Sequence, residues 1–199
     1  PEGVATFEFP HLLNLIQRSE FDTIYHEHYS YLSLHSTRQI FAAHGLTVFD
    51  VEEIASHGGS LRLYVRHAAN DRLPVGPGVA RVQAREEQAG LTRLDGYLGF
   101  DSKVQKVKRD LLKFLIAAKE AGQTVAGYGA PAKGNTLLNY CGIRTDLLAF
   151  TVDRSPYKHG RFLPGTRIPV FPPEKIQEAR PDFLLILPWN LRDEIMEQM

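Results

Sequence analysis

The sequence predicts an α/β protein, and three features of the chain support this prediction. Short apolar segments typical of strands alternate with segments whose apolar residues recur every three or four positions, as in amphipathic helices. The strand candidates after Gly122 are apolar throughout, which is typical of a parallel sheet with helices on both faces. A glycine-rich turn, Gly127-Tyr128-Gly129, joins one of these strands to the helix that follows it.

The first third of the chain resembles the second half of an α/β domain whose last two strands form a pair. In order, the predicted elements are a strand over 4–10, a helix over 12–18, a helix over 37–44, a strand over 46–51 and a strand over 61–66. We expect Ser36 to cap the second helix at its N-terminus and Gly45 to follow its C-terminus. On the last strand, Leu61, Leu63 and Val65 alternate with polar residues and therefore share one face.

The middle of the chain predicts a linker followed by helices. Residues 68–78 are polar and contain two prolines and two glycines, which favours a linker. From 79 to 122 the pattern is mostly helical, with lysines interleaved among apolar residues at helical spacing. This pattern favours an amphipathic connecting helix with a solvated basic face over a nucleic-acid groove. We therefore divide the chain into residues 1–70, 71–122 and 123–199.

The last part of the chain alternates between strand and helix and predicts a compact unit around a parallel sheet. Its expected elements are a strand over 124–128, a helix over 132–140, a strand over 147–153, a loop over 156–173, a helix over 174–179, a strand over 181–187 and a helix from 191 onward.

Composition narrows the class of protein. The 199 residues include 23 Lys and Arg against 23 Asp and Glu, so neither a nucleic-acid-binding nor a membrane-surface protein is expected. No apolar run reaches the roughly 20 residues needed to span a bilayer. One cysteine, Cys141, cannot form a disulfide framework or a cysteine metal site, and it favours a cytoplasmic protein and a place in the core. The chain begins without Met and stops within a helical pattern, so we expect a piece of a longer protein.

The densest polar cluster is Tyr25-His26-Glu27-His28-Tyr29. A helical zinc site needs its histidines four residues apart, and these are two apart, so metal binding is not favoured. Packing of these side chains at a domain junction stays open as an alternative. Acid–base chemistry explains the cluster best, because an imidazole is a free base near neutral pH and a neighbouring carboxylate can orient it or raise its basicity.

A second cluster, residues 127–136, fits the dinucleotide-binding pattern G-x-G-x-x-G/A between a strand and a helix, and Asp153 ends the next strand. Lys133 and Asn135 favour a phosphate-bearing ligand at the helix N-terminus. Tight turns in doubly wound sheets also select glycine, so a purely structural turn stays an alternative.

Further candidates lie in loops. His57 precedes Gly58 and Gly59 in a glycine turn that we expect to lead into an edge strand, and it could line a site. His159 forms a small basic patch with Arg154 and Arg167 that could meet a diphosphate. Trp189 follows a strand and could belong to the core or offer a stacking surface.

Several of these segments resemble the S-adenosylmethionine-dependent sugar C-methyltransferases. Residues 21–31 and the turn over 56–62 resemble that family's catalytic region, and residues 127–134 and 164–170 resemble its C-terminal domain. The resemblance covers essentially the whole chain. It implies that residues 1–70 are the end of a methyltransferase-type Rossmann-like domain, 71–122 a helical linker and 123–199 a small Rossmann-like domain with a parallel sheet.

The resemblance implies methyl transfer from S-adenosylmethionine to a carbon next to the ketone of a nucleotide-linked keto-deoxysugar, through an enolate. Tyr25, Glu27 and His28 match the family's active-site motif. His28 would be the base, Glu27 would orient or charge it, and Tyr25 or His57 would hydrogen-bond the enolate oxygen. The residues expected to bind the nucleotide sugar lie in the second cluster and in a nearby loop: Gly127, Gly129, Lys133, Asn135 and His159.

Three parts of that family have no counterpart in this chain. An N-terminal zinc domain and the glycine-rich half that holds the cofactor would both precede Pro1, and a final strand would follow Met199. We therefore expect the S-adenosylmethionine pocket largely outside the chain, zinc only in the N-terminal domain, and no activity from this piece alone. Two alternatives remain: an NAD-binding dehydrogenase fragment with Asp153 on the ribose, and a non-catalytic binding module in which residues 25–28 are buried.

Overall fold

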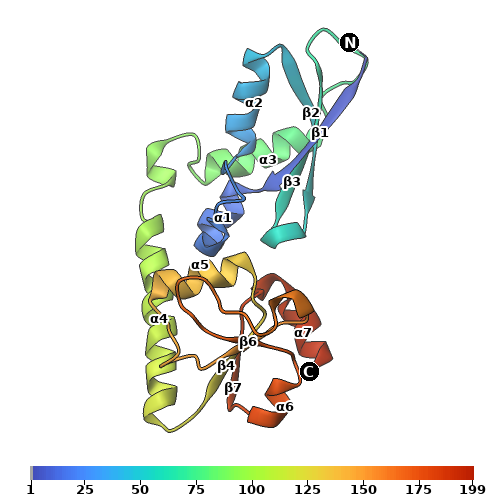
Figure 1. Ribbon diagram of the computed structural model, residues 1–199. Helices are drawn as coiled ribbons and strands as arrows, with labels where there is room; N and C mark the ends of the chain where they lie inside the picture. The colour runs from blue at the N-terminus through green and yellow to red at the C-terminus, as the bar shows by residue number, and fades with distance from the viewer. Residues whose placement is uncertain (1) are drawn as a thin grey trace. The chain divides into compact units, whose positions relative to one another are not determined.

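A computed structural model describes residues 2–199 of the chain (Figure 1). Its contacts divide the chain into two compact units. Unit 1 comprises residues 1–20 and 28–101, and unit 2 comprises residues 21–27 and 102–199. The chain therefore leaves unit 1 after Glu20, contributes seven residues to unit 2 and returns to unit 1 at His28.

Unit 1 contains a three-stranded antiparallel sheet of order β1-β3-β2. Its strands are β1 (Val4–Pro10), β2 (Leu46–Ile54) and β3 (Ser60–His67). Its helices are α1 (Leu12–Arg18), α2 (Leu34–Ala43) and α3 (Pro77–Gln88). The predicted pairing of the last two strands is confirmed, but β3 lies in the centre of the sheet, so the expectation of an edge strand after the glycine turn is wrong.

The core of unit 1 forms where the sheet packs against helices. As the alternation predicts, Leu61, Leu63 and Val65 are fully buried on one face, and they cluster with Leu34 of α2 and Val82 of α3. Burial of such side chains contributes roughly 1.5–3 kcal/mol each. Helix α3 lies within the segment 71–122 that the sequence assigns to a linker, and by its contacts it is part of unit 1.

The N-terminus of α2 differs from the prediction. Ser33, not Ser36, is the N-cap, and its hydroxyl accepts the Ser36 N–H at 3.0 Å while the Ser36 hydroxyl accepts the Ser33 N–H at 3.1 Å. This reciprocal capping box starts the helix three residues earlier than expected, because both serines satisfy backbone donors. Gly45 does follow the end of the helix, with a φ of +70°.

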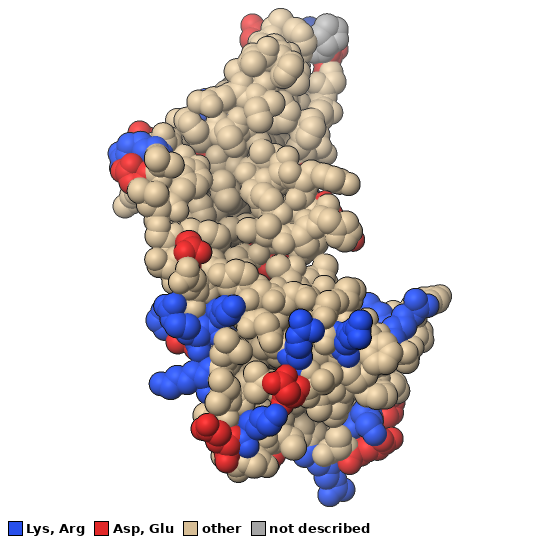
Figure 2. Space-filling view, turned by 60° about the vertical axis from the view of Figure 1, so that its left-hand side comes forward, with Lys and Arg blue, Asp and Glu red and all other residues tan. Residues whose placement is uncertain are grey.

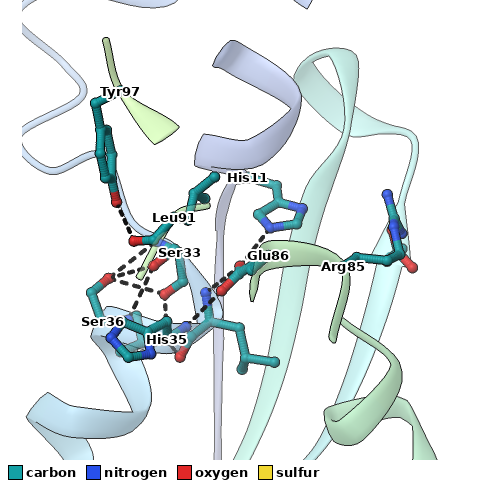
Figure 3. A network of polar contacts seen from close by, with 11 residues as sticks. His11, Ser33, His35, Ser36, Arg85, Glu86, Leu91 and Tyr97 are labelled. Carbon is teal, nitrogen blue, oxygen red and sulfur yellow. Dashed lines mark hydrogen bonds and ion pairs between the residues drawn. The ribbon is translucent and has the colours of Figure 1, made fainter. Parts of the chain in front are cut away.

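The buried Glu86 carboxylate links α3 to the start of α2 and to His11 (Figure 3). Glu86 accepts the Leu34 N–H at 2.7 Å on one carboxylate oxygen and the His35 N–H at 2.8 Å on the other. His11 Nε2 lies 2.7 Å from the first oxygen and must donate, because a carboxylate only accepts. Glu86 and His11 are completely enclosed, so this carboxylate caps α2 from the interior.

Unit 2 contains a four-stranded parallel sheet of order β6-β5-β4-β7. Its strands are β4 (Val125–Tyr128), β5 (Thr151–Val152), β6 (Val170–Phe171) and β7 (Phe183–Ile186). Its helices are α4 (Phe100–Glu120, which begins in unit 1), α5 (Ala132–Cys141), α6 (Lys175–Ala179) and α7 (Arg192–Gln198). The predicted parallel sheet and Rossmann-like α/β fold are confirmed.

Helices cover both faces of this sheet (Figure 1). Leu115 of α4 and Leu138 of α5 belong to a core cluster on one face, whereas Ile176 of α6 and Ile195 of α7 pack in a cluster on the other. Cys141 is buried in the first cluster, as expected, and burial raises the pKa of its thiol to about 11. The strand predicted over 147–153 is shorter, and the sequence misses β6, a two-residue strand within a loop rich in Pro and Gly.

Charged side chains lie mainly at the surface. In Figure 2, Lys and Arg of unit 2 are interspersed with Asp and Glu over the face shown. On α4, Lys106 pairs with Asp110, while Lys108 and Lys119 donate to the backbone carbonyls of Tyr140 and Asp146. Among residues 2–199, no helix is long and apolar enough to cross a membrane.

Candidate active site

The Tyr25–His28 motif lies where the chain passes from unit 2 back to unit 1. A short 3-10 helix, η1 (Phe21–Thr23), leads into a turn that contains Tyr25 and Glu27. Both belong to unit 2, and His28 is the first residue of the returning segment of unit 1. Tyr25 and His28 are half-buried and Glu27 is exposed. The alternative of a non-catalytic binding module requires residues 25–28 to be buried, and the exposed Glu27 does not meet this requirement.

The structure brings His28 and His57 together within unit 1. Their ring centroids are 6.0 Å apart and the ring planes are perpendicular. His57 lies in the short helix η2 (Ser56–Gly58) with φ 56° and ψ 20°, a left-handed conformation that is uncommon for a residue with a Cβ. Such strained residues cluster at functional sites, where the surrounding structure holds them in place.

Helix α1 holds the turn that carries His57. Gly59 has a φ of +125°, and a Cβ at this position would lie 2.3 Å from the Asn14 side-chain nitrogen. Arg18 donates to the Gly58 carbonyl at 2.6 Å, and the Gly59 carbonyl accepts the His11 N–H at 3.0 Å. The glycine therefore serves close approach of the turn to α1, and this packing fixes His57.

A substitution of Gly59 tests this packing. Gly59→Ala is expected to destabilise unit 1 by about 2–4 kcal/mol, because it combines an unfavourable backbone conformation with overpacking against Asn14. Gly45→Ala is the matched control: its φ is also positive, but no atom lies within 4 Å of the added Cβ, so a loss of only about 1–2 kcal/mol is expected. Urea unfolding followed by circular dichroism measures both. Equal losses for the two variants would show that contact with Asn14 does not matter.

The glycine turn of unit 2 is closed by the protein's own side chains. An added Cβ would lie 2.6 Å from the Thr151 hydroxyl at Gly127 and 2.5 Å from Pro188 Cδ at Gly129. At Gly134, one turn into α5, it would lie 2.7 Å from Leu187 Cβ. Contacts among β4, β5 and the residues after β7 therefore require all three glycines, and whether the turn also binds a ligand stays a prediction.

Asp153, at the end of β5, closes the same turn. Its carboxylate accepts the Ala130 N–H at 2.7 Å and the Ser155 N–H at 2.8 Å, and it pairs with Lys158 at 2.9 Å. Burial alone would raise the pKa of Asp153, but these donors outweigh burial and hold its pKa below the usual value. The carboxylate thus binds groups of its own chain, unlike the free ribose acceptor that a dehydrogenase fragment would need.

The lowered pKa predicts an acid dependence of stability. Ionised Asp153 stabilises unit 2 above the unfolded-state pKa of about 3.9, and this contribution is lost as the pH falls through the lower folded-state pKa. Asp153→Asn is expected to cost about 1–3 kcal/mol near neutral pH, with the difference from the parent shrinking below about pH 4. Denaturation at several pH values measures the free energy of unfolding. The value for Lys158→Gln is expected to lie between those of the parent and of Asp153→Asn. A constant difference from pH 7 to pH 2 would contradict this role.

The other residues predicted to bind the nucleotide sugar lie around this edge of the sheet. His159 Nε2 lies 2.7 Å from the Asp153 carbonyl oxygen, and the Asn135 side chain accepts from Asn139. Lys133 is buried, and its Nζ donates to Asn190 Oδ1 at 2.8 Å. Asp153 and His159 thus lie close together through this bond, whereas the Lys133 ammonium donates to Asn190, which follows β7.

A crevice lies at the carboxyl ends of the parallel strands. The strand order reverses at β4, between β5 and β7, and ligands of open α/β sheets bind at such a point. A cavity of about 250 Å³ lies there, lined in part by Gly129, Asp153, Lys158 and Pro188. A neighbouring cavity of about 460 Å³ shares Tyr128, Arg154 and Gln198 with it. Within residues 2–199, no group of three or more His, Cys, Asp or Glu side chains could hold a metal ion.

Comparison with known proteins decides the family. The model of the C-methyltransferase C-terminal domain matches residues 55–199. The chain belongs to the C-methyltransferase family. It is 39% identical over 197 residues to the C-methyltransferase NovU of Streptomyces niveus, an alignment that covers 99% of this chain and 47% of NovU. The chain thus spans about half the length of the curated relative it matches.

The two comparisons cover different parts of this C-methyltransferase chain. The family model takes in His57 and the glycine turn of unit 2 but begins after the Tyr25–His28 motif. The alignment with NovU extends over nearly the whole chain and confirms the resemblance inferred from the sequence.

The sequence analysis gave no role to two polar residues of this chain, Asp22 and Asn190, that unit 2 brings to the same cluster. Asp22, inside the quoted motif, accepts the Trp189 indole N–H at 2.7 Å, and Asn190 accepts from Lys133. No local pattern marked Asp22, because the donor that its buried carboxylate needs, Trp189, lies 167 positions away.

Proposed function

We propose that this chain is part of an enzyme that transfers a methyl group from S-adenosylmethionine to a carbon next to the ketone of a nucleotide-linked keto-deoxysugar. The observation that carries the proposal is the His28–His57 pair at a strained turn, in a chain of the C-methyltransferase family. Two imidazoles at this distance can divide the work of removing a proton and stabilising the charge that results.

In the proposed reaction, His28 removes the proton from the carbon next to the ketone. The electron pair of the broken C–H bond moves toward the ketone oxygen, so that an enolate forms and its carbon becomes the nucleophile. Glu27 orients His28. Tyr25 or His57 donates a hydrogen bond to the enolate oxygen, where the charge develops. The short ring separation favours His57 for this last role.

The S-adenosylmethionine pocket is expected largely outside this chain, and zinc only in an N-terminal domain. When bound, the cofactor would supply an electrophilic methyl group. The glycine turn of unit 2 does not fit this cofactor, because the Asp153 carboxylate that would accept its ribose hydroxyls already binds the Ala130 and Ser155 N–H groups and Lys158. We therefore expect residues 1–199 alone to be inactive.

For the nucleotide end of the substrate, we propose the crevice at the carboxyl ends of the unit 2 strands. Arg154 and Lys158 line it together with the predicted residue Gly129 and could pair with a diphosphate. The predicted residues Gly127, Asn135 and His159 are not among the residues that line it. Balanced charge argues against nucleic acid or a membrane surface as the partner. The single cysteine favours a cytoplasmic enzyme.

The direct test is to supply the intact protein with S-adenosylmethionine carrying a deuterated methyl group and with a thymidine-diphosphate keto-deoxysugar. The expected result is a deuterated methyl group on the carbon next to the ketone, seen by mass spectrometry and NMR. Transfer to another atom, or no transfer across a panel of such sugars, would overturn the proposal. Titration with thymidine diphosphate and with NADH, followed by Trp189 fluorescence, separates it from the dehydrogenase alternative: only thymidine diphosphate should bind.

A further inference from the structure

The segment that carries Tyr25 and Glu27 is seated on unit 2 by contacts that the proposed reaction does not use. Helix η1 packs on α5, where the Phe21 and Tyr140 rings lie 4.9 Å apart. Asp22 and Thr23 are buried although both are polar. A buried carboxylate outside the proposed chemistry needs another reason for its position.

Two residues after β7, Trp189 and Asn190, provide that reason together with Lys133 of α5. Asp22 accepts the Trp189 indole N–H at 2.7 Å, across 167 positions of sequence. The Lys133 ammonium lies 4.4 Å from the centre of the Trp189 ring and donates to Asn190. Burial raises the pKa of Asp22, against the Trp189 hydrogen bond and the positive charge of Lys133. The cluster Asp22, Trp189, Lys133 and Asn190, here called the clamp, thus pairs one buried carboxylate with one buried cation around a single ring.

The clamp joins two features of the proposed reaction on one compact unit. Lys133 stands in the first turn of α5, directly after the glycine turn, and Pro188, beside Trp189, fills the space at Gly129. Asp22 stands three residues before Tyr25 and five before Glu27. The same few side chains therefore fix both the turn proposed to meet the nucleotide and the segment that carries Tyr25 and Glu27.

We infer that Asp22, Trp189 and Lys133 are positioning residues, which hold the Tyr25–Glu27 segment at a set distance from the nucleotide-binding edge of unit 2. Lys133 thus acts through the indole ring rather than on the substrate. The inference rests on the proposed function for the role of Tyr25 and Glu27, but the clamp itself is a property of unit 2. A displacement of about 1 Å in such a segment can lower a rate about 100-fold.

The test uses the intact protein with Asp22→Ala, Asp22→Asn and Trp189→Phe, and with Tyr157→Phe as a control at an exposed aromatic of the same unit. Asp22→Ala removes the acceptor, Asp22→Asn keeps an acceptor oxygen, and Trp189→Phe keeps the ring but removes the N–H donor. Amide hydrogen exchange of residues 24–27 is expected to speed up in Asp22→Ala and Trp189→Phe, and to stay near the parent rate in Asp22→Asn and Tyr157→Phe. The emission of Trp189, the single tryptophan of residues 1–199, is expected to shift to longer wavelength in Asp22→Ala, and the spectrum of Trp189→Phe gives the contribution of any tryptophan elsewhere in the intact protein.

In the methyl-transfer assay, Asp22→Ala is expected to lower kcat about 10–100-fold with little change in KM, and Asp22→Asn to restore most of kcat. Unchanged exchange at residues 24–27 in folded Asp22→Ala would overturn the inference, and so would an equal loss of kcat in Asp22→Asn. If Asp22→Ala does not fold, hydrogen exchange at residues 24–27 and kcat of Trp189→Phe against the parent decide. If the parent protein transfers no methyl group, the proposed function fails, while exchange and fluorescence still decide on the clamp.

Discussion

Replacing His28 by asparagine in the intact protein is expected to lower kcat for methyl transfer by about 10²–10⁴-fold, the usual contribution of a general base. Asparagine approximates the size of the imidazole but cannot take up a proton near neutral pH. The loss should therefore appear at the proton-removal step. Exchange of the hydrogen next to the ketone with deuterated solvent, measured without the methyl donor, reports on that step alone and should fall by a similar factor.

The control for this substitution is His26→Asn, an exposed histidine two residues away in the same motif. It is expected to keep the parent rates of exchange and methyl transfer. Full activity and unchanged hydrogen exchange in His28→Asn would remove His28 from the role of base. His57→Asn would then be the next variant, because its ring lies closest to the same position in unit 1.

The largest expected effect on stability comes from Glu86. Glu86→Ala should destabilise unit 1 by about 3–5 kcal/mol, because it removes the acceptor of three buried hydrogen-bond donors. The Leu34 and His35 N–H groups and the His11 ring would all lose their acceptor in an enclosed site (Figure 3). Each buried donor left without a partner costs about 1–3 kcal/mol.

Urea unfolding of Glu86→Ala measures this effect. Glu87→Ala, at the next position of α3, is the control. Glu87 is exposed, so its substitution should change the free energy of unfolding by less than about 0.5 kcal/mol. Glu86→Gln keeps one acceptor oxygen and should lie between the two. A loss below about 1 kcal/mol for Glu86→Ala would mean that water or a rearranged helix start replaces the carboxylate.

Much of the secondary structure could be predicted because it follows from local pattern. The alternation Leu61, Leu63, Val65 predicts both a strand and its buried face, and all three side chains are buried. Predictions were wrong where side chains compete for one backbone group: Ser33 and Ser36 are both good caps, and the structure uses Ser33. The two-residue strand β6 carries too short a pattern to be predicted.

The sequence by itself determined the α/β class and the family, because the Tyr25–His28 motif and the glycine turn are short local patterns. Only the tertiary structure decided which distant residues meet. The His57 ring lies beside the His28 ring, the Asp22 carboxylate accepts the Trp189 N–H, and the Asp153 carboxylate accepts the Ala130 N–H. It also decided that close contacts of the chain with itself require Gly59, Gly127 and Gly129. Periodicity records which side of an element is buried, whereas the partner of a buried polar group depends on how all the elements pack.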